Sequence, residues 1–476
     1  TATVAGSYAI TASLGGTAVG GTNPVTGVFT AGAATAASSR VAISAGPKTA
    51  NGVDAYTLTV SALDANGNLS SGSNTFTFSA PAAGASLSAS SCTTTAGTCS
   101  VTLTATVAGS YAIAASLGGS AVGGTNPVQA RFEPGEPVAS ASRVSISAGP
   151  KLANGVESYT ITASAYDPQG NLGNTTATTF NFSPAPAGSS LSASSCVSAA
   201  SGPDAGTCSV TLTATVAGSY AITASLGGTA VGGGNPVTGV FVAGLPTAAQ
   251  SRVAISAGPK LANGVDSYTI TATAYDAQGN LSTASANVFD FSAPAVGGSL
   301  SASSCSTVAG SCSVTLTATV AGTYAITASI GGSLVGGSNP VSAVFVAGSP
   351  TAGGSRVVIS AGPKTANGSD AYTITASAYD AQGNLNTSSV SSFSFSAPGA
   401  GASLSASTCS TTAGVCSVTL TATVAGSYAV TASTGGVPVG GGNPVTGVFV
   451  AGLPTAAQSR VAISAGPKLA NGVDSY

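Results

Sequence analysis

Apolar and small polar residues alternate along several stretches of this chain. Ser267–Tyr275 reads Ser-Tyr-Thr-Ile-Thr-Ala-Thr-Ala-Tyr, and the same period of two runs through Cys312–Val320 and Tyr324–Ile330. A period of two with β-branched and aromatic residues predicts strands that each bury one face. No stretch keeps a helical period, so the pattern predicts an all-β protein.

Turn residues separate these stretches at regular places. Pairs of phenylalanines, each followed by a proline that ends a strand, occur at Phe76/Phe78, Phe180/Phe182, Phe289/Phe291 and Phe393/Phe395. An Asp that can close an Asx turn precedes a Gly in Asp64–Asn68, Asp276–Asn280 and Asp380–Asn384. Six or seven short strands in about a hundred residues, divided by such turns, predict a β-sandwich.

The pattern repeats along the chain. The phrase SRVAISAGPKLANGVDSY occupies residues 251–268 and again 459–476, and close variants begin at Ser39, Ser142 and Ser355. The period is about 104 residues, so the chain is an array of one module. One copy is longer because of five extra residues between Cys196 and Cys208.

We therefore expect four complete modules and two partial ones, cut from a longer array. The predicted boundaries are 1–33 for the C-terminal strands of a partial repeat, 38–134, 141–243, 250–347 and 354–451 for complete repeats, and 458–476 for the N-terminal strand of another partial repeat. Each complete repeat is long enough to bury one core.

The repeat resembles two known families. Its opening, Ser251-Arg-Val with Ala257-Gly-Pro-Lys, and its close, Val320-Ala-Gly-Thr-Tyr with Ser338-Asn-Pro-Val, resemble filamin-type immunoglobulin repeats. Its middle, from Tyr-Asp-Ala-Gln-Gly-Asn to Ser-Val-Thr-Leu-Thr-Ala-Thr, is similar to bacterial Ig-like repeats of the invasin and intimin class. The resemblance implies a tandem array of Ig-like antiparallel β-sandwich domains. A tyrosine step that resembles the tyrosine corner of such domains occurs at Tyr8, Tyr111, Tyr220, Tyr324 and Tyr428.

The cysteines come as one pair in each complete module. With no His and no clustered acid beside them, such pairs indicate disulfides and not zinc sites. The predicted disulfide cysteines are Cys92, Cys99, Cys196, Cys208, Cys305, Cys312, Cys409 and Cys416. The short connection predicts that each pair staples the two strands of one hairpin. Disulfides indicate an oxidising compartment, so we expect an extracellular or cell-surface location.

Charge is scarce throughout the chain. Charged residues make up 5% of the sequence and the net charge is −2, against about 25% charged residues in ordinary domains. This composition provides no positively charged surface that would bind nucleic acid or an anionic membrane. No run of 18 uninterrupted apolar residues occurs, so no membrane span is expected in this sequence.

The residue inventory argues against catalysis. His is absent, so the many hydroxyls lack the usual base, and the scattered carboxylates form no acid–base pair. We therefore expect a protein that is not an enzyme and has no cofactor and no metal site. The Asp-x-(Asn/Gln)-Gly-Asn turn supplies one carboxylate and two amides, fewer than calcium needs; a structural turn is favoured over a weak cation site.

Two further sets of residues carry alternative interpretations. The arginines of the Ser-Arg-Val step are interpreted as surface charges or weak salt bridges, or alternatively as residues that fix the angle between modules: Arg40, Arg143, Arg252, Arg356 and Arg460. Glycosylation sequons, which arise by chance in a chain rich in Ser and Thr, occur at Asn68, Asn174, Asn181, Asn280, Asn367 and Asn386.

These patterns favour a mechanical role. We expect a non-enzymatic stalk or fibre of an adhesin-like surface protein, whose partners are neighbouring repeats and other copies of the chain. The first alternative is a self-assembling filament or sheath, because the weakly charged strands have little electrostatic protection against edge-to-edge pairing. The second is an Ig-like module that binds a ligand by strand addition.

Overall fold

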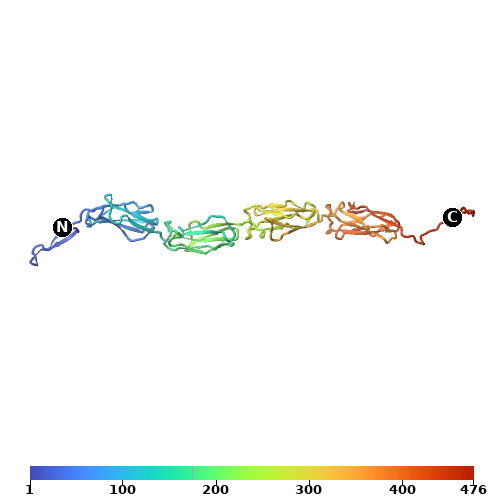
Figure 1. Cartoon of the computed structure of the whole chain (residues 1–476). Helices are drawn as coiled ribbons and strands as arrows, with labels where there is room; N and C mark the ends of the chain where they lie inside the picture. The colour runs from blue at the N-terminus through green and yellow to red at the C-terminus, as the bar shows by residue number, and fades with distance from the viewer. Residues whose placement is uncertain (174, 476) are drawn as a thin grey trace. The chain divides into compact units, whose positions relative to one another are not determined.

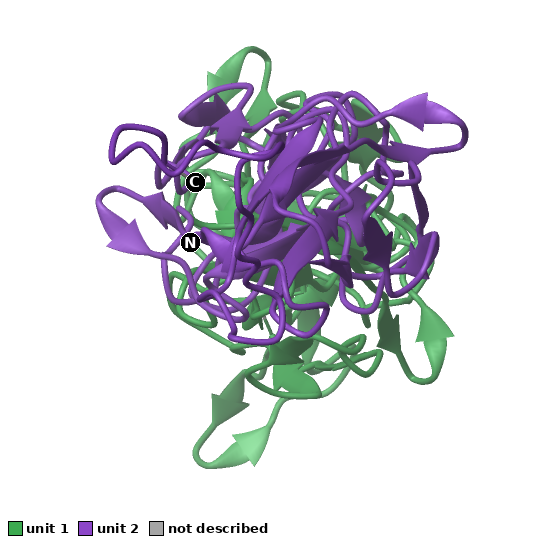
Figure 2. Cartoon of the chain, turned by 90° about the vertical axis from the view of Figure 1, so that its right-hand side faces the viewer, with its two compact units in different colours: residues 1–244 green, residues 245–476 purple. Residues whose placement is uncertain are grey.

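In the computed structural model, which describes residues 1–173 and 175–475, every regular element is a β-strand (Figure 1). The predicted all-β class is therefore confirmed. The chain divides into two compact units, Thr1–Gly244 and Leu245–Tyr476 (Figure 2). Each unit holds two complete modules, and the first unit also holds the short segment 1–33.

The strands fall into a short N-terminal group and four similar modules. The N-terminal group is β1 (Gly6–Ile10), β2 (Ser13–Leu14), β3 (Thr17–Ala18) and β4 (Val25–Phe29). The first module is β5 (Arg40–Ile43), β6 (Lys48–Thr49), β7 (Ala55–Ser61), β8 (Thr75–Phe78), β9 (Ala85–Leu87), β10 (Ser91–Thr93), β11 (Thr98–Ala105), β12 (Gly109–Ile113), β13 (Ala115–Leu117), β14 (Ser120–Ala121) and β15 (Val128–Glu133). The second module is β16 (Arg143–Ile146), β17 (Lys151–Leu152), β18 (Ser158–Ser164), β19 (Thr179–Phe182), β20 (Ser189–Leu191), β21 (Ser195–Val197), β22 (Thr207–Ala214), β23 (Gly218–Ile222), β24 (Ala224–Leu226), β25 (Thr229–Ala230) and β26 (Val237–Val242).

The second unit repeats this order of strands. The third module is β27 (Arg252–Ile255), β28 (Lys260–Leu261), β29 (Ser267–Thr273), β30 (Val288–Phe291), β31 (Gly298–Leu300), β32 (Ser304–Ser306), β33 (Ser311–Ala318), β34 (Gly322–Ile326), β35 (Ala328–Ile330), β36 (Ser333–Leu334) and β37 (Val341–Val346). The fourth module is β38 (Arg356–Ile359), β39 (Lys364–Thr365), β40 (Ala371–Ser377), β41 (Ser392–Phe395), β42 (Ala402–Leu404), β43 (Thr408–Ser410), β44 (Val415–Ala422), β45 (Gly426–Val430), β46 (Ala432–Thr434), β47 (Val437–Pro438) and β48 (Val445–Val450).

Each module is a sandwich of two layers. In the first module one layer is a four-stranded sheet in the order β5-β7-β11-β9. The facing layer combines the sheet β10-β8-β13-β14 with the sheet β12-β15-β6, in which β6 pairs parallel to β15. Strands β12 and β13 follow one another across Ala114, so one extended segment joins both sheets of this layer. The same orders recur in the other three modules.

The core of each module lies between the layers and is built by the alternation seen in the sequence. On β29, Tyr268, Ile270 and Ala272 are buried, while the intervening threonines point outward. Leu316 on the neighbouring strand β33 and Phe289 on β30 of the facing layer are fully buried. Burying each such side chain contributes about 1.5–3 kcal/mol relative to leaving it in water, so every module has its own source of stability.

Aromatic rings close one end of this core. In the third module Phe345 packs edge-on against Tyr268 and Tyr324, with ring centroids 5.2 and 5.7 Å away. The Tyr324 hydroxyl donates a 2.8 Å hydrogen bond to the Val320 carbonyl, four residues upstream. The predicted tyrosine corner is confirmed here and at Tyr8, Tyr111, Tyr220 and Tyr428.

Two predicted strands differ in the structure. The stretch Tyr324–Ile330 is not one strand, because β34 pairs with β37 and, after Thr327, β35 pairs with β30. Residues 458–475 do not form the expected N-terminal strand. In a complete module that strand, for example β27, pairs with the second strand after it, β29. Among the described residues, no strand after residue 463 takes the place that β29 has beside β27.

The segment 1–33 forms the expected C-terminal strands without a facing layer. Strand β1 pairs with β4, and β2 pairs with β3. Tyr8 is 37% exposed and Phe29 is 40% exposed, whereas the equivalent Tyr111 and Phe132 are buried in the first module. The difference follows because the layer that would cover these rings is not part of the segment.

Candidate functional site

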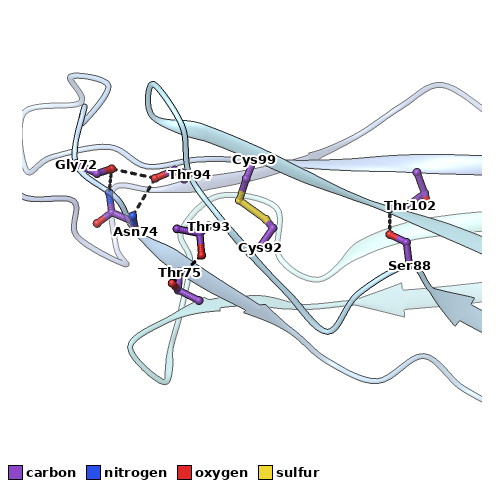
Figure 3. The surroundings of a disulfide bond; sticks show 9 residues. All are labelled: Gly72, Asn74, Thr75, Ser88, Cys92, Thr93, Thr94, Cys99 and Thr102. Carbon is purple, nitrogen blue, oxygen red and sulfur yellow. Dashed lines mark hydrogen bonds between the residues drawn. A yellow bond between two sulfur atoms is a disulfide. The ribbon is translucent and has the colours of Figure 1, made fainter.

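The paired cysteines connect the two layers of each module. The structure joins Cys92 to Cys99 with their Cα atoms 5.9 Å apart, and it makes the equivalent bond in each other module, Cys196–Cys208, Cys305–Cys312 and Cys409–Cys416. Cys92 lies on β10 and Cys99 on β11, and these strands belong to different sheets (Figure 3).

The disulfide is therefore not a staple within a simple two-stranded hairpin. A tight turn at Ala96-Gly97, with φ of 51° and 84°, does join the two strands. Beyond that turn the strands diverge, because β10 pairs with β8 while β11 pairs with β7. The bond consequently links an edge strand of one layer to an inner strand of the other, and opposes separation of the layers.

A buried hydroxyl close to the disulfide holds the neighbouring loop. Thr94 is 4% exposed. Its hydroxyl accepts from the backbone amide of Asn74 at 3.0 Å and donates to the Gly72 carbonyl at 3.0 Å (Figure 3). Sequence reasoning missed this role, although the signal was a Ser or Thr two residues after the first cysteine of every module. The equivalent buried residues are Ser198, Thr307 and Thr411.

The Asp-x-x-Gly-Asn turn lies at one end of the module and is tightly bonded. In the second module Asp167 is fully buried, and its carboxylate accepts hydrogen bonds from the backbone amides of Gln169, Asn171 and Gly135 at 2.8–2.9 Å. The side-chain amide of Asn171 donates a further bond at 2.9 Å. The carboxylate is thus surrounded by N–H groups, an arrangement that favours a structural turn over a cation ligand.

The same hydrogen bonds set the acidity of these carboxyl groups. The side-chain amide of Asn68, with backbone amides of Asn68 and Gly32, lowers the pKa of Asp64 to about 2. Burial alone would raise the pKa of Asp167 and Asp380, but the hydrogen bonds to their carboxylates outweigh it and lower the pKa of both. Within the described residues, no three His, Cys, Asp or Glu side chains gather as a metal site.

Three of the arginines, Arg40, Arg143 and Arg356, make contacts inside their own modules. The Arg40 guanidinium donates to the carbonyls of Ala37, Ser38 and Ser39 at 2.6–2.9 Å. Arg143 and Arg356 instead lie over the rings of Tyr166 and Tyr379, 5.4 and 5.2 Å from the ring centroids. These contacts favour a local role and give no support to the alternative that the arginines set the angle between modules.

Four sequon asparagines have their side chains engaged in hydrogen bonds, and one of them, Asn367, accepts from the backbone amides of Ser369 and Asp370. Asn68 and Asn280 donate to the carboxylates of Asp64 and Asp276, and Asn386 donates to the Gly348 carbonyl at 2.7 Å. The sequon at Asn174 lies outside the described residues. In the part of the chain that the structure covers, no helix is long and apolar enough to cross a membrane.

The two-layered modules with a tyrosine corner define the chain as a tandem array of immunoglobulin-like sandwiches. The model of the bacterial Ig-like domain (group 1) matches residues 38–133, 250–346 and 354–450, more than half of the chain. The chain therefore belongs to the bacterial Ig-like domain (group 1) family. The second module, outside these matches, has the same three sheets.

Solved structures with similar folds include three bacterial proteins. The Escherichia coli adhesin FdeC is 22% identical, with 67% of this chain and 100% of that chain covered and a TM-score of 0.43. Invasin, a bacterial integrin-binding protein, is 20% identical, with coverage of 86% and 78% and a TM-score of 0.41. InvD of Yersinia pseudotuberculosis is 20% identical, with coverage of 65% and 98% and a TM-score of 0.39. No curated protein matches the chain.

Proposed function

We propose that this chain is a non-enzymatic stalk segment of an adhesin-like protein on the bacterial cell surface. Its role is to span distance and hold another element away from the cell. The observation that carries the proposal is that each complete module has its own closed core and its own layer-to-layer disulfide. Such units can be added in series without changing any one of them.

The chemistry of the modules supports an exposed location. Disulfides persist in oxidising compartments outside the cytosol. The chain contains no Met, which removes one oxidisable side chain, and few Lys or Arg residues at which trypsin could cleave. The resemblance of the repeat to invasin-type Ig-like domains supports the same location.

The proposal can be tested with the full chain. Light scattering at increasing concentration, followed by negative-stain imaging, measures association and length together. We expect monomers whose length corresponds to about 40 Å for each module, because strands of about eight residues rise about 3.3 Å per residue and loops add to this. Ordered fibres or sheets that form with concentration would instead support the self-assembling filament. A compact monomer would contradict the stalk.

A further inference from the structure

The last Asn of the turn reaches into the module that precedes it. Asn171 belongs to the second module, yet its side-chain oxygen accepts a 2.8 Å hydrogen bond from the backbone amide of Ala108 in the first. Its side-chain nitrogen donates to the Thr106 carbonyl at 3.0 Å. Asn171 thus bonds to the backbone on both sides of Val107, as a neighbouring strand would, and is only 9% exposed.

The same contact occurs inside the second unit. Asn384 of the fourth module accepts from the Ala321 amide at 2.8 Å and donates to the Thr319 carbonyl at 3.0 Å, both in the third module. Asn384 is 7% exposed. Asn68 of the first module makes the equivalent pair of bonds to Ala5 and Thr3 of the N-terminal segment, at 2.8 and 2.9 Å.

The Asp of the turn accepts hydrogen bonds both from this side-chain amide and from the linker between the modules. Asp167 accepts from the Asn171 side chain at 2.9 Å and from the Gly135 backbone amide in the linker at 2.9 Å. Asp380 does the same with Asn384 at 3.0 Å and with Gly348 at 2.8 Å. Preceding module, linker and following module therefore meet at one carboxylate–amide pair.

We infer that the Asp–Asn pair of this turn is a lock that fixes the orientation of two successive modules. A rotation between the two modules would break both bonds of the Asn171 amide to the preceding backbone, so the Ala108 amide and the Thr106 carbonyl would lose these partners. From the sequence alone, these residues were predicted only to form a turn, and not a contact between modules. It is defined by contacts within each unit, and so holds whether or not the chain acts as the proposed stalk.

Distance measurements on the full chain test this inference. Spin labels on unnatural amino acids at the exposed positions Val53 and Val197 report the distance between the first two modules without touching the disulfides. We expect Asn171→Ala to broaden the distance distribution about twofold and to speed hydrogen exchange of the Ala108 amide about tenfold or more. Asn171→Asp, which keeps the size but loses the amide donor, should also broaden the distribution.

A matched control is available in the first module. The Asn74 side chain donates a local bond to the Gly72 carbonyl, within the first module, so Asn74→Ala should leave the distance distribution unchanged. Exchange of the Ile161 amide shows that the second module stays folded in each variant. If Asn171→Ala unfolds the second module, Asn171→Asp takes its place in the test. Asn384→Ala, followed by hydrogen exchange of the Ala321 amide, tests the same contact between the third and fourth modules. An unchanged distribution in folded variants, or equal broadening by Asn74→Ala, would overturn the lock.

Discussion

Gly258 lies directly against the phenol of Tyr268, so that a Cβ atom added at Gly258 would overlap the tyrosine hydroxyl. The same close approach joins Gly46 to Tyr56, Gly149 to Tyr159 and Gly362 to Tyr372. The hydroxyl of Tyr268 is itself fixed, because it donates to the Val344 carbonyl at 2.9 Å. The glycine of the repeated Ala-Gly-Pro-Lys phrase is therefore required by the core tyrosine that follows it.

Gly258→Ala should destabilise the third module. The tyrosine cannot move away without losing its hydrogen bond and its packing on Phe345, so we expect a loss of about 1–3 kcal/mol, as for other overpacked cores. Urea denaturation of the full chain measures it. Gly322→Ala is the control in the same module, because a Cβ atom at Gly322 meets nothing within 4 Å. Equal effects of the two changes would contradict this explanation of the glycine.

Removing the hydroxyl of the tyrosine corner should lower the free energy of unfolding by less than Gly258→Ala does. Tyr324→Phe keeps the ring against Phe345 but deletes the bond to the Val320 carbonyl, so we expect a loss of about 0.5–1.5 kcal/mol. Thermal or urea unfolding measures the change. Tyr275→Phe, on a half-buried ring of the same module, serves as the reference. A Tyr324→Phe protein as stable as the parent would show that water replaces the lost partner.

The period of two was enough to predict the longest strands of the module, since it reports directly which face of a strand is buried. It placed β29 and β33 within two residues of their observed ends. The tyrosine corner was predicted from its resemblance to that of known Ig-like domains, and its bond spans only four residues. Local patterns of this kind are visible to a reader of the sequence alone.

Features that depend on distant partners could not be predicted in this way. The break at Thr327 arises because the two halves of one stretch pair with different strands, β37 and β30. The disulfide joins two layers because β10 and β11 choose different neighbours, which spacing between cysteines does not reveal. Asn171 meets Ala108 across 63 residues, and its sequence context predicted only a turn.

Removing a disulfide should weaken the module that carries it. Replacing Cys305 and Cys312 together by Ala frees the unfolded chain of a short loop constraint, so we expect a loss of about 2–3 kcal/mol in the third module. Urea unfolding followed by module-specific tyrosine or exchange probes measures it. Modules that keep their cysteines are internal controls and should be unaffected. Mass spectrometry that found free thiols at Cys305 and Cys312 in the unmodified chain would contradict the bond itself.

Acid should lower the stability of the first module by protonating Asp64. The pKa of this carboxyl is lowered from 3.8 to about 2 in the folded chain by hydrogen bonds from Asn68 and Gly32. A lowered pKa in the folded state means that the unfolded chain binds the proton more readily. The contribution of Asp64 to stability is therefore fully present above about pH 5 and is lost as the pH falls through about 4 toward 2.

Urea denaturation at a series of pH values between 5 and 2 tests this effect, with the carboxyl titration followed by carbon NMR. The parent chain should lose stability over this range more steeply than Asp64→Asn, which has no proton to take up at that position. Asp290→Asn, at an exposed position on β30, controls for the change in net charge. If Asp64 titrated near 4 in the folded chain, its hydrogen bonds would not favour the ionised form, and the steeper loss should disappear.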